Sequence, residues 1–305
     1  MAGDGCGFGV GADSFGLGQE TGCGGTLLEA ARTGKGTWKM DSRDFDFKRI
    51  AQGYKNRPFL HKQVMERFGK EVTGRTFSHG LDVGCGAGLS SKALKRICTH
   101  VTGADISPEM VRVAKEVCGD GQEYDFMVSR AEEIPAVGGK YDIVTAAGVI
   151  QWVDREPFLR NLANIMEERG YVLIYDFAIS GQMKGTEGKA YAAWWEERYL
   201  KEFPKPYRNE YVWTKEDVEP YGFSMLGQVR YGMEYEFDMD SFMDFMMIQS
   251  NVNAKIEKGV REAGEVREWF ARTLEPVFCS PAGSEKRTLV FTGYSWYMAF
   301  GGHGQ

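Results

Sequence analysis

An apolar segment that runs into a glycine-rich turn constrains the fold of this chain more than any other feature. Residues 81–91 read Leu-Asp-Val-Gly-Cys-Gly-Ala-Gly-Leu-Ser-Ser, which predicts a strand, a turn that is nearly all backbone, and then a helix. Gly84, Gly86 and Gly88 remove Cβ atoms that would block a ligand, permit positive φ and leave N–H groups at a helix N-terminus. The segment therefore predicts a turn against which a nucleotide packs.

The spacing of these glycines, G-x-G-x-G behind Asp82, narrows the kind of nucleotide site. A dinucleotide fingerprint reads G-x-G-x-x-G, and a phosphate loop needs a Lys followed by Ser or Thr, so both are disfavoured. A second apolar segment ends in Asp105, about 20 residues beyond the turn, where a carboxylate can accept hydrogen bonds from both ribose hydroxyls. The turn and the acid together are far more specific than either alone.

Strand-like and helical patterns alternate along the first half of the chain. Strands are expected at residues 80–83, 100–106, 124–128, 141–146 and 171–177, and helices at 89–97, 108–117 and 157–168. Such alternation implies right-handed crossovers and a doubly wound, mostly parallel, Rossmann-like α/β sheet. Ligands of such sheets bind beyond the carboxyl ends of the strands, so the turn and Asp105 should meet at one mouth.

At this point the motifs resemble those of the class I S-adenosylmethionine-dependent methyltransferases. The resemblance spans residues 45–178 and rests on the glycine turn, on Ala104-Asp105-Ile106-Ser107-Pro108-Glu109-Met110, and on Tyr141-Asp142-Ile143-Val144 running into Gln151-Trp152-Val153. The most similar branch methylates small molecules and includes the trans-aconitate methyltransferase type. The resemblance implies S-adenosyl-L-methionine as cofactor and a small-molecule substrate.

The resemblance also implies residues that hold the methionine and ribose parts of this cofactor. Asp82 and the glycine turn would lie near the methionine end, Asp105 on the ribose, and the Ala147 carbonyl near the amino group. Arg57, in a Tyr-Lys-Asn-Arg-Pro segment, would hold the methionine carboxylate by a bidentate bond. The alternatives are a solvated Arg57 and an Asp82 that bonds local backbone.

For the adenine, the resemblance places Ile106 against the ring face and Ala131 and Glu132 near the ring edge. Relatives often carry Asp where this chain has Arg130, so the side-chain contact to the adenine amine is open. Backbone N–H groups are the alternative means of reading the ring.

The second half of the chain is rich in aromatic residues and methionine and predicts a helical lid over the substrate. Trp152, Trp194 and Trp195 are the candidates for the substrate side. Core packing is the alternative for each, since Trp195 belongs to a helical repeat at i, i+4 and i+8 with Tyr191 and Tyr199. No catalytic residue is identified, because methyl transfer from a sulfonium relies mainly on positioning. None of the four histidines, His61 included, is expected to act as a base.

These features predict four parts of the chain. Residues 1–39 are rich in Gly, Ser, Thr and other small residues and show neither helical nor strand periodicity, which predicts a disordered or misannotated extension. Residues 40–180 should form the cofactor-binding core, 181–285 the lid with part of the sheet, and 286–305 a closing strand and tail.

Composition excludes several classes of function. A net charge of −6 argues against a nucleic-acid partner, and no apolar run reaches the roughly 18 residues needed to span a bilayer. The six cysteines form no C-x-x-C pair, so they indicate free thiols in the cytoplasm and no metal site. The oligomeric state is not readable from the sequence.

Two other functions remain open. One is a methyltransferase that acts on a protein or RNA, for which an added recognition domain or basic face would be expected. The other is a non-catalytic protein that binds S-adenosylmethionine, because a fold alone does not prove function.

Overall fold

A long mixed sheet organises the chain. The computed structural model describes residues 53–54, 57–119, 121–205, 212–280, 283–284 and 286–302. The prediction of a disordered or misannotated extension at residues 1–39 lies outside the described residues.

Within the described ranges, the main sheet has seven strands in the order β3-β2-β1-β4-β5-β9-β6. The strands are β1 (Phe77–Val83), β2 (Cys98–Asp105), β3 (Tyr124–Val128), β4 (Tyr141–Ala147), β5 (Met166–Met183), β6 (Phe223–Phe237) and β9 (Arg287–Phe300). Strands β1 to β5 pair in parallel, whereas β9 runs antiparallel to both β5 and β6. The predicted Rossmann-like, mostly parallel α/β fold is therefore confirmed.

Helices cover both faces of the parallel strands. On one face lie α2 (His61–Phe68), α3 (Leu89–Leu94) and α4 (Pro108–Cys118), and on the other lie α5 (Arg155–Ile165) and α8 (Lys215–Val218). Helix α4 begins where local chemistry predicts, because the Ser107 hydroxyl accepts the Met110 N–H and Pro108 takes the first position. Short turns of helix are η2 (Gly69–Thr73), η3 (Ala131–Glu133), η4 (Ile150–Trp152) and η6 (Glu219–Tyr221).

Three strands extend beyond the carboxyl end of β4. The last register pair of β4 is Ala147 with Tyr175, yet β5 continues to Met183, where it pairs with Leu289 of β9. Strand β6 follows β9 over the same length. Because parallel strands present their carboxyl ends at one edge, this extension lies on the ligand-binding side of the sheet.

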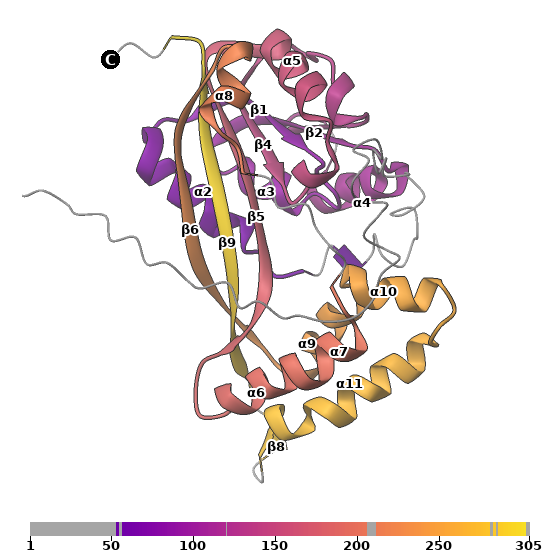
Figure 1. Cartoon of the computed structure of the whole chain (residues 1–305). Coiled ribbons are helices and arrows are strands. Elements are labelled where there is room, and N and C mark those ends of the chain that lie inside the picture. The colour runs from indigo at the N-terminus through magenta and orange to yellow at the C-terminus, as the bar shows by residue number, and fades with distance from the viewer. Residues whose placement is uncertain are drawn as a thin grey trace, which may run out of the picture. The chain divides into compact units, whose positions relative to one another are not determined.

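A group of helices, here called the lid, packs around the far ends of these strands (Figure 1). Its members are α6 (Gly188–Trp194), η5 (Trp195–Tyr199), α7 (Leu200–Glu202), α9 (Met239–Met247), α10 (Ser250–Glu257) and α11 (Ala263–Phe278). A small hairpin of β7 (Cys279–Ser280) and β8 (Gly283–Ser284) follows α11. No helix among the described residues is long and apolar enough to cross a membrane.

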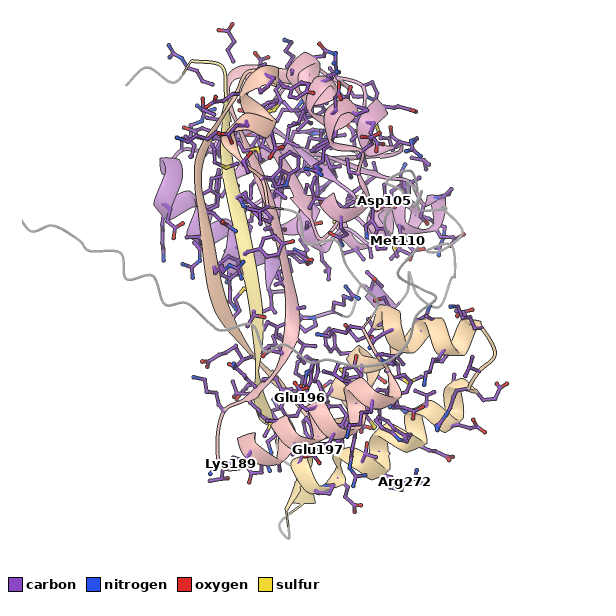
Figure 2. The ribbon with its side chains drawn as sticks, viewed as in Figure 1. Asp105, Met110, Lys189, Glu196, Glu197 and Arg272 are labelled. Atoms are coloured by element: carbon purple, nitrogen blue, oxygen red, sulfur yellow. The ribbon has the colours of Figure 1, made fainter. Side chains whose placement is uncertain are left out.

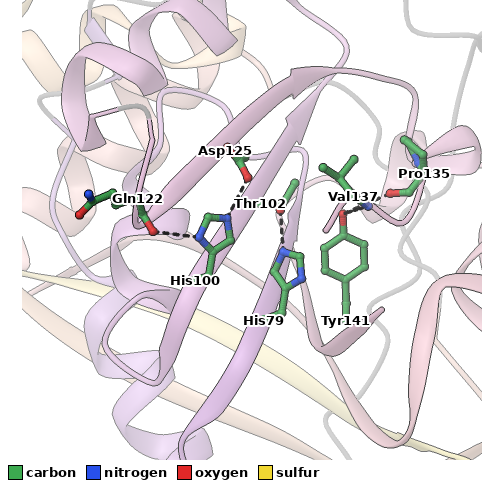
Figure 3. A network of polar contacts seen from close by, with 8 residues as sticks. All are labelled: His79, His100, Thr102, Gln122, Asp125, Pro135, Val137 and Tyr141. Atoms are coloured by element: carbon green, nitrogen blue, oxygen red, sulfur yellow. Dashed lines mark hydrogen bonds and ion pairs between the residues drawn. The ribbon is translucent and has the colours of Figure 1, made fainter. Parts of the chain in front are cut away.

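A polar network lies near the amino ends of β1 and β2, at the opposite end of these strands from the glycine turn (Figure 3). His79 and His100 are register partners there, with ring centroids 5.1 Å apart. His79 Nε2 hydrogen-bonds Thr102 Oγ1 at 2.9 Å, and His100 Nε2 lies 2.9 Å from Asp125 Oδ2. Both histidines lie inside their strands, which begin earlier than the sequence pattern predicted, and both are remote from the glycine turn.

Candidate functional site

The glycine turn, residues 84–88, has the backbone that its sequence predicts. Gly84, Gly86 and Gly88 all have positive φ, at 65°, 51° and 89°. A Cβ on Gly84 would lie 2.6 Å from Val149 Cγ2, whereas a Cβ on Gly86 would meet no atom within 4 Å. Gly84 is therefore needed for packing, and Gly86 is the position whose open side can receive a ligand.

Asp105, at the end of β2, is bonded to this turn. Its Oδ2 accepts the Gly86 N–H and its Oδ1 accepts the Ser107 N–H, each at 2.9 Å. These two bonds orient the Asp105 carboxylate at the end of β2, next to the glycine turn. Figure 2 shows Asp105, at the end of β2, and Met110, in α4, on the side that faces the lid, and Ile106, which follows Asp105, is half-buried.

The side chain of Asp82 is fully buried beneath the turn. Its carboxylate accepts the hydroxyls of Ser90 at 2.6 Å, Ser91 at 2.7 Å and Thr145 at 2.9 Å. Burial outweighs these three bonds and raises the pKa of Asp82 to about 6. The side chain thus ties β1 to α3 and β4 through hydroxyls, and not through the local backbone that the sequence alternative named. The two serines that follow the turn were the signal for this network, and the sequence interpretation missed them.

At the position expected for the adenine edge, Glu132 is committed to other partners. Its Oε1 accepts the Asp154 N–H at 2.9 Å, and its Oε2 lies 3.4 Å from Arg130 Nη2. Ala131 is half-buried and packs against the face of the sheet that α5 covers. These contacts fix η3 against the start of α5, so the backbone of this turn is held in place beyond β3.

Ala147 is the last residue of β4 and leads into a turn held by two further bonds. The Gly148 N–H donates to the Tyr175 carbonyl at 2.8 Å, and Gln151 Nε2 donates to the Gly148 carbonyl at 3.0 Å. The turn therefore stays at the mouth, between the ends of β4 and β5.

The described residues 53–54 and 57–61, here called the strap, contact the glycine turn through Tyr54 and β5 through His61. Tyr54 packs on the cluster of Ala87, Met110 and Val113 beside the glycine turn. The guanidinium carbon of Arg57 lies 3.7 Å from the centre of the Tyr54 ring, and Arg57 Nε is buried without a hydrogen-bond partner among the described residues. A buried donor of this kind calls for an acceptor, which a ligand carboxylate would supply.

The strap ends in a hydrogen bond that the sequence did not predict. His61 Nδ1 lies 2.8 Å from the hydroxyl of Tyr175, a buried residue of β5. Burial and then the charge of Arg57 lower the pKa of His61 to about 3, so its imidazole is neutral. The two residues lie 114 positions apart, so no local pattern could pair them.

The three candidate tryptophans occupy different environments. Trp194 and Trp195 are only 4% and 3% exposed and belong to the lid's own aromatic core, where Trp194 Nε1 donates to Thr273 Oγ1 at 3.0 Å. Trp152, in η4 after β4, is 42% exposed, so the alternative that it fills the core is wrong. Of the three, Trp152 is the one with an exposed side chain, and it follows the carboxyl end of β4 by five residues.

Metal ligation has no support in the described residues, where no group of three His, Cys, Asp or Glu side chains converges. The cysteines in those ranges, Cys85, Cys98, Cys118 and Cys279, are free thiols. Cys6 and Cys23 lie outside the described residues.

The strand order, the left-handed glycine turn and the acid that ends β2 define a Rossmann-like nucleoside-binding domain. Residues 81–174 match the family model described as a methyltransferase domain. Over these residues the chain is similar to the class I S-adenosylmethionine-dependent methyltransferases, a class of enzymes whose cofactor is S-adenosylmethionine.

Similar proteins agree with this assignment. A ubiquinone biosynthesis O-methyltransferase from Caulobacter sp. (strain K31) is 32% identical over 122 residues, which cover 38% of this chain and 48% of that protein. A malonyl-[acyl-carrier protein] O-methyltransferase 1 from Ilyobacter polytropus is 32% identical over 136 residues, covering 43% and 50%. The chain thus spans about half the length of the curated relatives it matches.

Similarity in fold extends further along the chain than similarity in sequence. A provisionally named type II methyltransferase from Anaeromyxobacter dehalogenans superposes with a TM-score of 0.57 at 19% identity, covering 78% of this chain and 95% of that one. At this identity the likeness shows the fold alone.

Proposed function

We propose that this chain transfers the methyl group of S-adenosylmethionine to a small-molecule acceptor held between the glycine turn and the lid. The observation that carries the proposal is the extension of β5, β9 and β6 past the carboxyl end of β4, because it brings the lid to the ligand-binding side of the sheet. A protein or RNA acceptor would instead require an open recognition face.

The residues around the turn fit the cofactor. The open side of Gly86 admits the ligand, the Asp105 carboxylate ends β2 beside that turn where the ribose would lie, and Arg57 Nε is a buried donor without a partner among the described residues. Ala131 and the Ala147 turn complete the set at the ends of β3 and β4. Asp82 supports the site from below, because its buried carboxylate accepts hydrogen bonds from three hydroxyl groups.

S-adenosylmethionine supplies an electrophilic methyl group when bound. What remains for the chain's own residues is to orient the acceptor in line with that group and to exclude water, and orientation alone can contribute about 7–11 kcal/mol at best. The strap and the lid are placed to exclude water, and Trp152 offers an exposed ring beside the turn that follows β4. No proton transfer is assigned to a residue here.

The acceptor atom is left open between oxygen, nitrogen and carbon. The named relatives are O-methyltransferases, but the family match at residues 81–174 covers the cofactor side of the site. The lid, which would recognise the acceptor, lies outside that match. Because the named relatives methylate oxygen, an oxygen acceptor is the first to test.

The proposal is tested with isotopically labelled S-adenosylmethionine. The purified chain is incubated in parallel with a metabolite extract, a protein fraction and an RNA fraction, and label transfer to each is measured. Transfer to a small metabolite is expected. Transfer only to protein or RNA would replace the proposal with a macromolecular methyltransferase, and binding of S-adenosylhomocysteine without any transfer would indicate a non-catalytic binding protein.

A further inference from the structure

We propose that the hydrogen bond between His61 and Tyr175 is a latch that positions Arg57 to bind the carboxylate of the cofactor's methionine part. The inference rests on the proposed function, because it assigns a positioning role within the same site. Neither His61 nor Tyr175 is proposed to contact the acceptor or to move a proton.

The first support is the path of the strap, which touches three parts of the molecule. Gly53 lies against the lid so closely that a Cβ there would be 2.6 Å from Ile248 Cγ2. Tyr54 packs beside the glycine turn, and His61 reaches β5 through Tyr175. Since the strap contacts the lid, the turn and the sheet, its position is fixed by a few defined contacts, and the latch supplies the polar one at its end.

The second support is the short connection between Arg57 and His61. Pro58 and Leu60 are buried between them, the Leu60 N–H donates to the Pro58 carbonyl at 2.8 Å, and the Gln63 N–H donates to the Leu60 carbonyl at 2.9 Å. Proline also restricts the backbone of the residue before it, which is Arg57 itself. Because this connection is short and restricted, a displacement of His61 should also displace Arg57.

The third support is the state of the Arg57 side chain. Its guanidinium is stacked on Tyr54 at 3.7 Å, and the Arg57 N–H donates to the Tyr54 carbonyl at 3.1 Å, so the group is oriented before any ligand arrives. Its Nε is nevertheless buried and unpartnered within the described residues. A donor that is already oriented and shielded from water forms its strongest hydrogen bond with a carboxylate, because hydrogen bonds between ionised groups are stronger than those between neutral groups.

Charge explains why a histidine can occupy this place beside an arginine. The neutral imidazole avoids repulsion with Arg57, and its Nδ1 can then accept a hydrogen bond from the Tyr175 hydroxyl. The buried hydroxyl of Tyr175 needs such a partner. The ring of His61 also packs edge-on against Phe177, with centroids 4.9 Å apart, which holds the imidazole toward β5.

The experiment compares two ligands that differ only in the carboxylate: S-adenosylhomocysteine and its decarboxylated analogue. Affinities are measured by calorimetry for the wild type, Tyr175→Phe, His61→Ala and His61→Asn, with thermal melting of each. Tyr175→Phe and His61→Ala are expected to weaken S-adenosylhomocysteine binding about tenfold and to leave the decarboxylated analogue within about twofold, the size of effect expected when one charge-assisted bond is misaligned. His61→Asn should retain more affinity than His61→Ala, because its amide oxygen lies close to the position of Nδ1.

Two controls separate a latch from a merely structural bond. Tyr191→Phe removes another buried tyrosine hydroxyl, one that joins the lid to the far end of β5 by donating to the Ser180 carbonyl at 3.2 Å, and should change neither affinity. In an Arg57→Ala background, Tyr175→Phe should cause no further loss for S-adenosylhomocysteine, because the latch acts through Arg57.

The outcomes are distinguishable. Equal losses for both ligands, or a further loss in the Arg57→Ala background, would show that the bond only stabilises the fold and would overturn the latch. Unchanged affinity in Tyr175→Phe and His61→Ala would also overturn it. A wild-type chain that binds neither ligand would overturn the proposed function, and the latch with it. If Tyr175→Phe fails to fold, the comparison of His61→Ala with His61→Asn still decides.

Discussion

The Asp105 carboxylate accepts the backbone N–H of Gly86 at 2.9 Å, so the acid that ends β2 holds the glycine turn that follows β1. The sequence predicted both features for their contacts to a ligand. The structure adds that they also contact each other, which means that the turn is shaped before a ligand binds. Such pre-organisation lowers the ordering cost of binding.

Replacement of Asp105 by Ala is expected to weaken S-adenosylhomocysteine binding about ten- to a hundredfold, because hydrogen bonds to charged groups are worth about 1.5–3 kcal/mol. Calorimetry measures the affinity. Asp125→Ala is the matched control, since Asp125 pairs with His100 at the opposite edge of the sheet and should leave binding unchanged. Equal affinity in wild type and Asp105→Ala would remove Asp105 from the site.

Asp82 makes stability depend on pH in a direction that can be worked out. Its pKa is raised from 3.8 to about 6, so the folded chain holds this proton more tightly than the unfolded chain does. The contribution of this bound proton to the free energy of unfolding is fully present below pH 3.8 and is lost as the pH rises through about 6. By the free-energy value of a pKa shift, the loss amounts to roughly 3 kcal/mol at most.

The variant Asp82→Asn should therefore remove a pH dependence. Its amide keeps a hydrogen-bonding group of the same shape but does not titrate. Urea unfolding at pH 4, 5, 6 and 7 is expected to show the difference in unfolding free energy between wild type and variant shifting in favour of the variant as the pH rises. A difference that stays constant across this range would contradict the raised pKa. Ser91→Ala, which removes one hydroxyl donor and no charge, is the control for lost hydrogen bonding.

His79 gives the opposite pH dependence at the other edge of the sheet. Burial, and then the neighbouring His100, lower the pKa of His79 from its usual 6.5. A group whose pKa is lowered on folding contributes stability above pH 6.5 that is lost as the pH falls. His79→Gln, which keeps a donor for Thr102, should lose less melting temperature between pH 7 and pH 5 than the wild type loses. An equal fall in melting temperature for wild type and variant would show that another group causes the loss of stability at acidic pH.

Strands β1 to β4 and the glycine turn were predictable because their signals are local. Continuous apolar runs bounded by turn residues mark buried parallel strands, and β3 was placed at both ends as observed. Strand β6 was not predicted as a strand. Its residues alternate between exposed and half-buried at the edge of the sheet, and Gly227 and Gly232 interrupt its pattern, so only pairing with β9 defines it.

The distal half of β5 and the latch could not be predicted from local sequence patterns either, because both depend on contacts between distant parts of the chain. Strand β5 was expected to end at Phe177, but pairing with β9 carries it through Gly181 to Met183. That extension is what brings the lid to the ligand-binding side. The contact of His61 with Tyr175 likewise depends on where α2 crosses the sheet, which no pattern within either segment specifies.

Two tryptophans that the sequence placed on the substrate side should now behave differently. Trp194 is buried among aromatic rings of the lid and donates to Thr273, so Trp194→Ala should lower the unfolding free energy by about 3–5 kcal/mol, as loss of a large core side chain does. Trp152 is 42% exposed, so Trp152→Ala should change stability by only about 0.5 kcal/mol.

For turnover, in contrast to stability, the larger effect is expected at Trp152. If the exposed ring of Trp152 orients the acceptor at the end of β4, then Trp152→Ala should lower turnover on the small-molecule acceptor about tenfold or more while S-adenosylhomocysteine affinity stays within about twofold, since misplacing a reactant costs rate rather than cofactor binding. Trp152→Phe should recover part of that turnover. Turnover is measured with labelled cofactor and affinity by calorimetry on the same preparations. A Trp152→Ala variant with wild-type turnover would exclude this ring from the acceptor wall and return the search for that wall to the lid residues that face the strap.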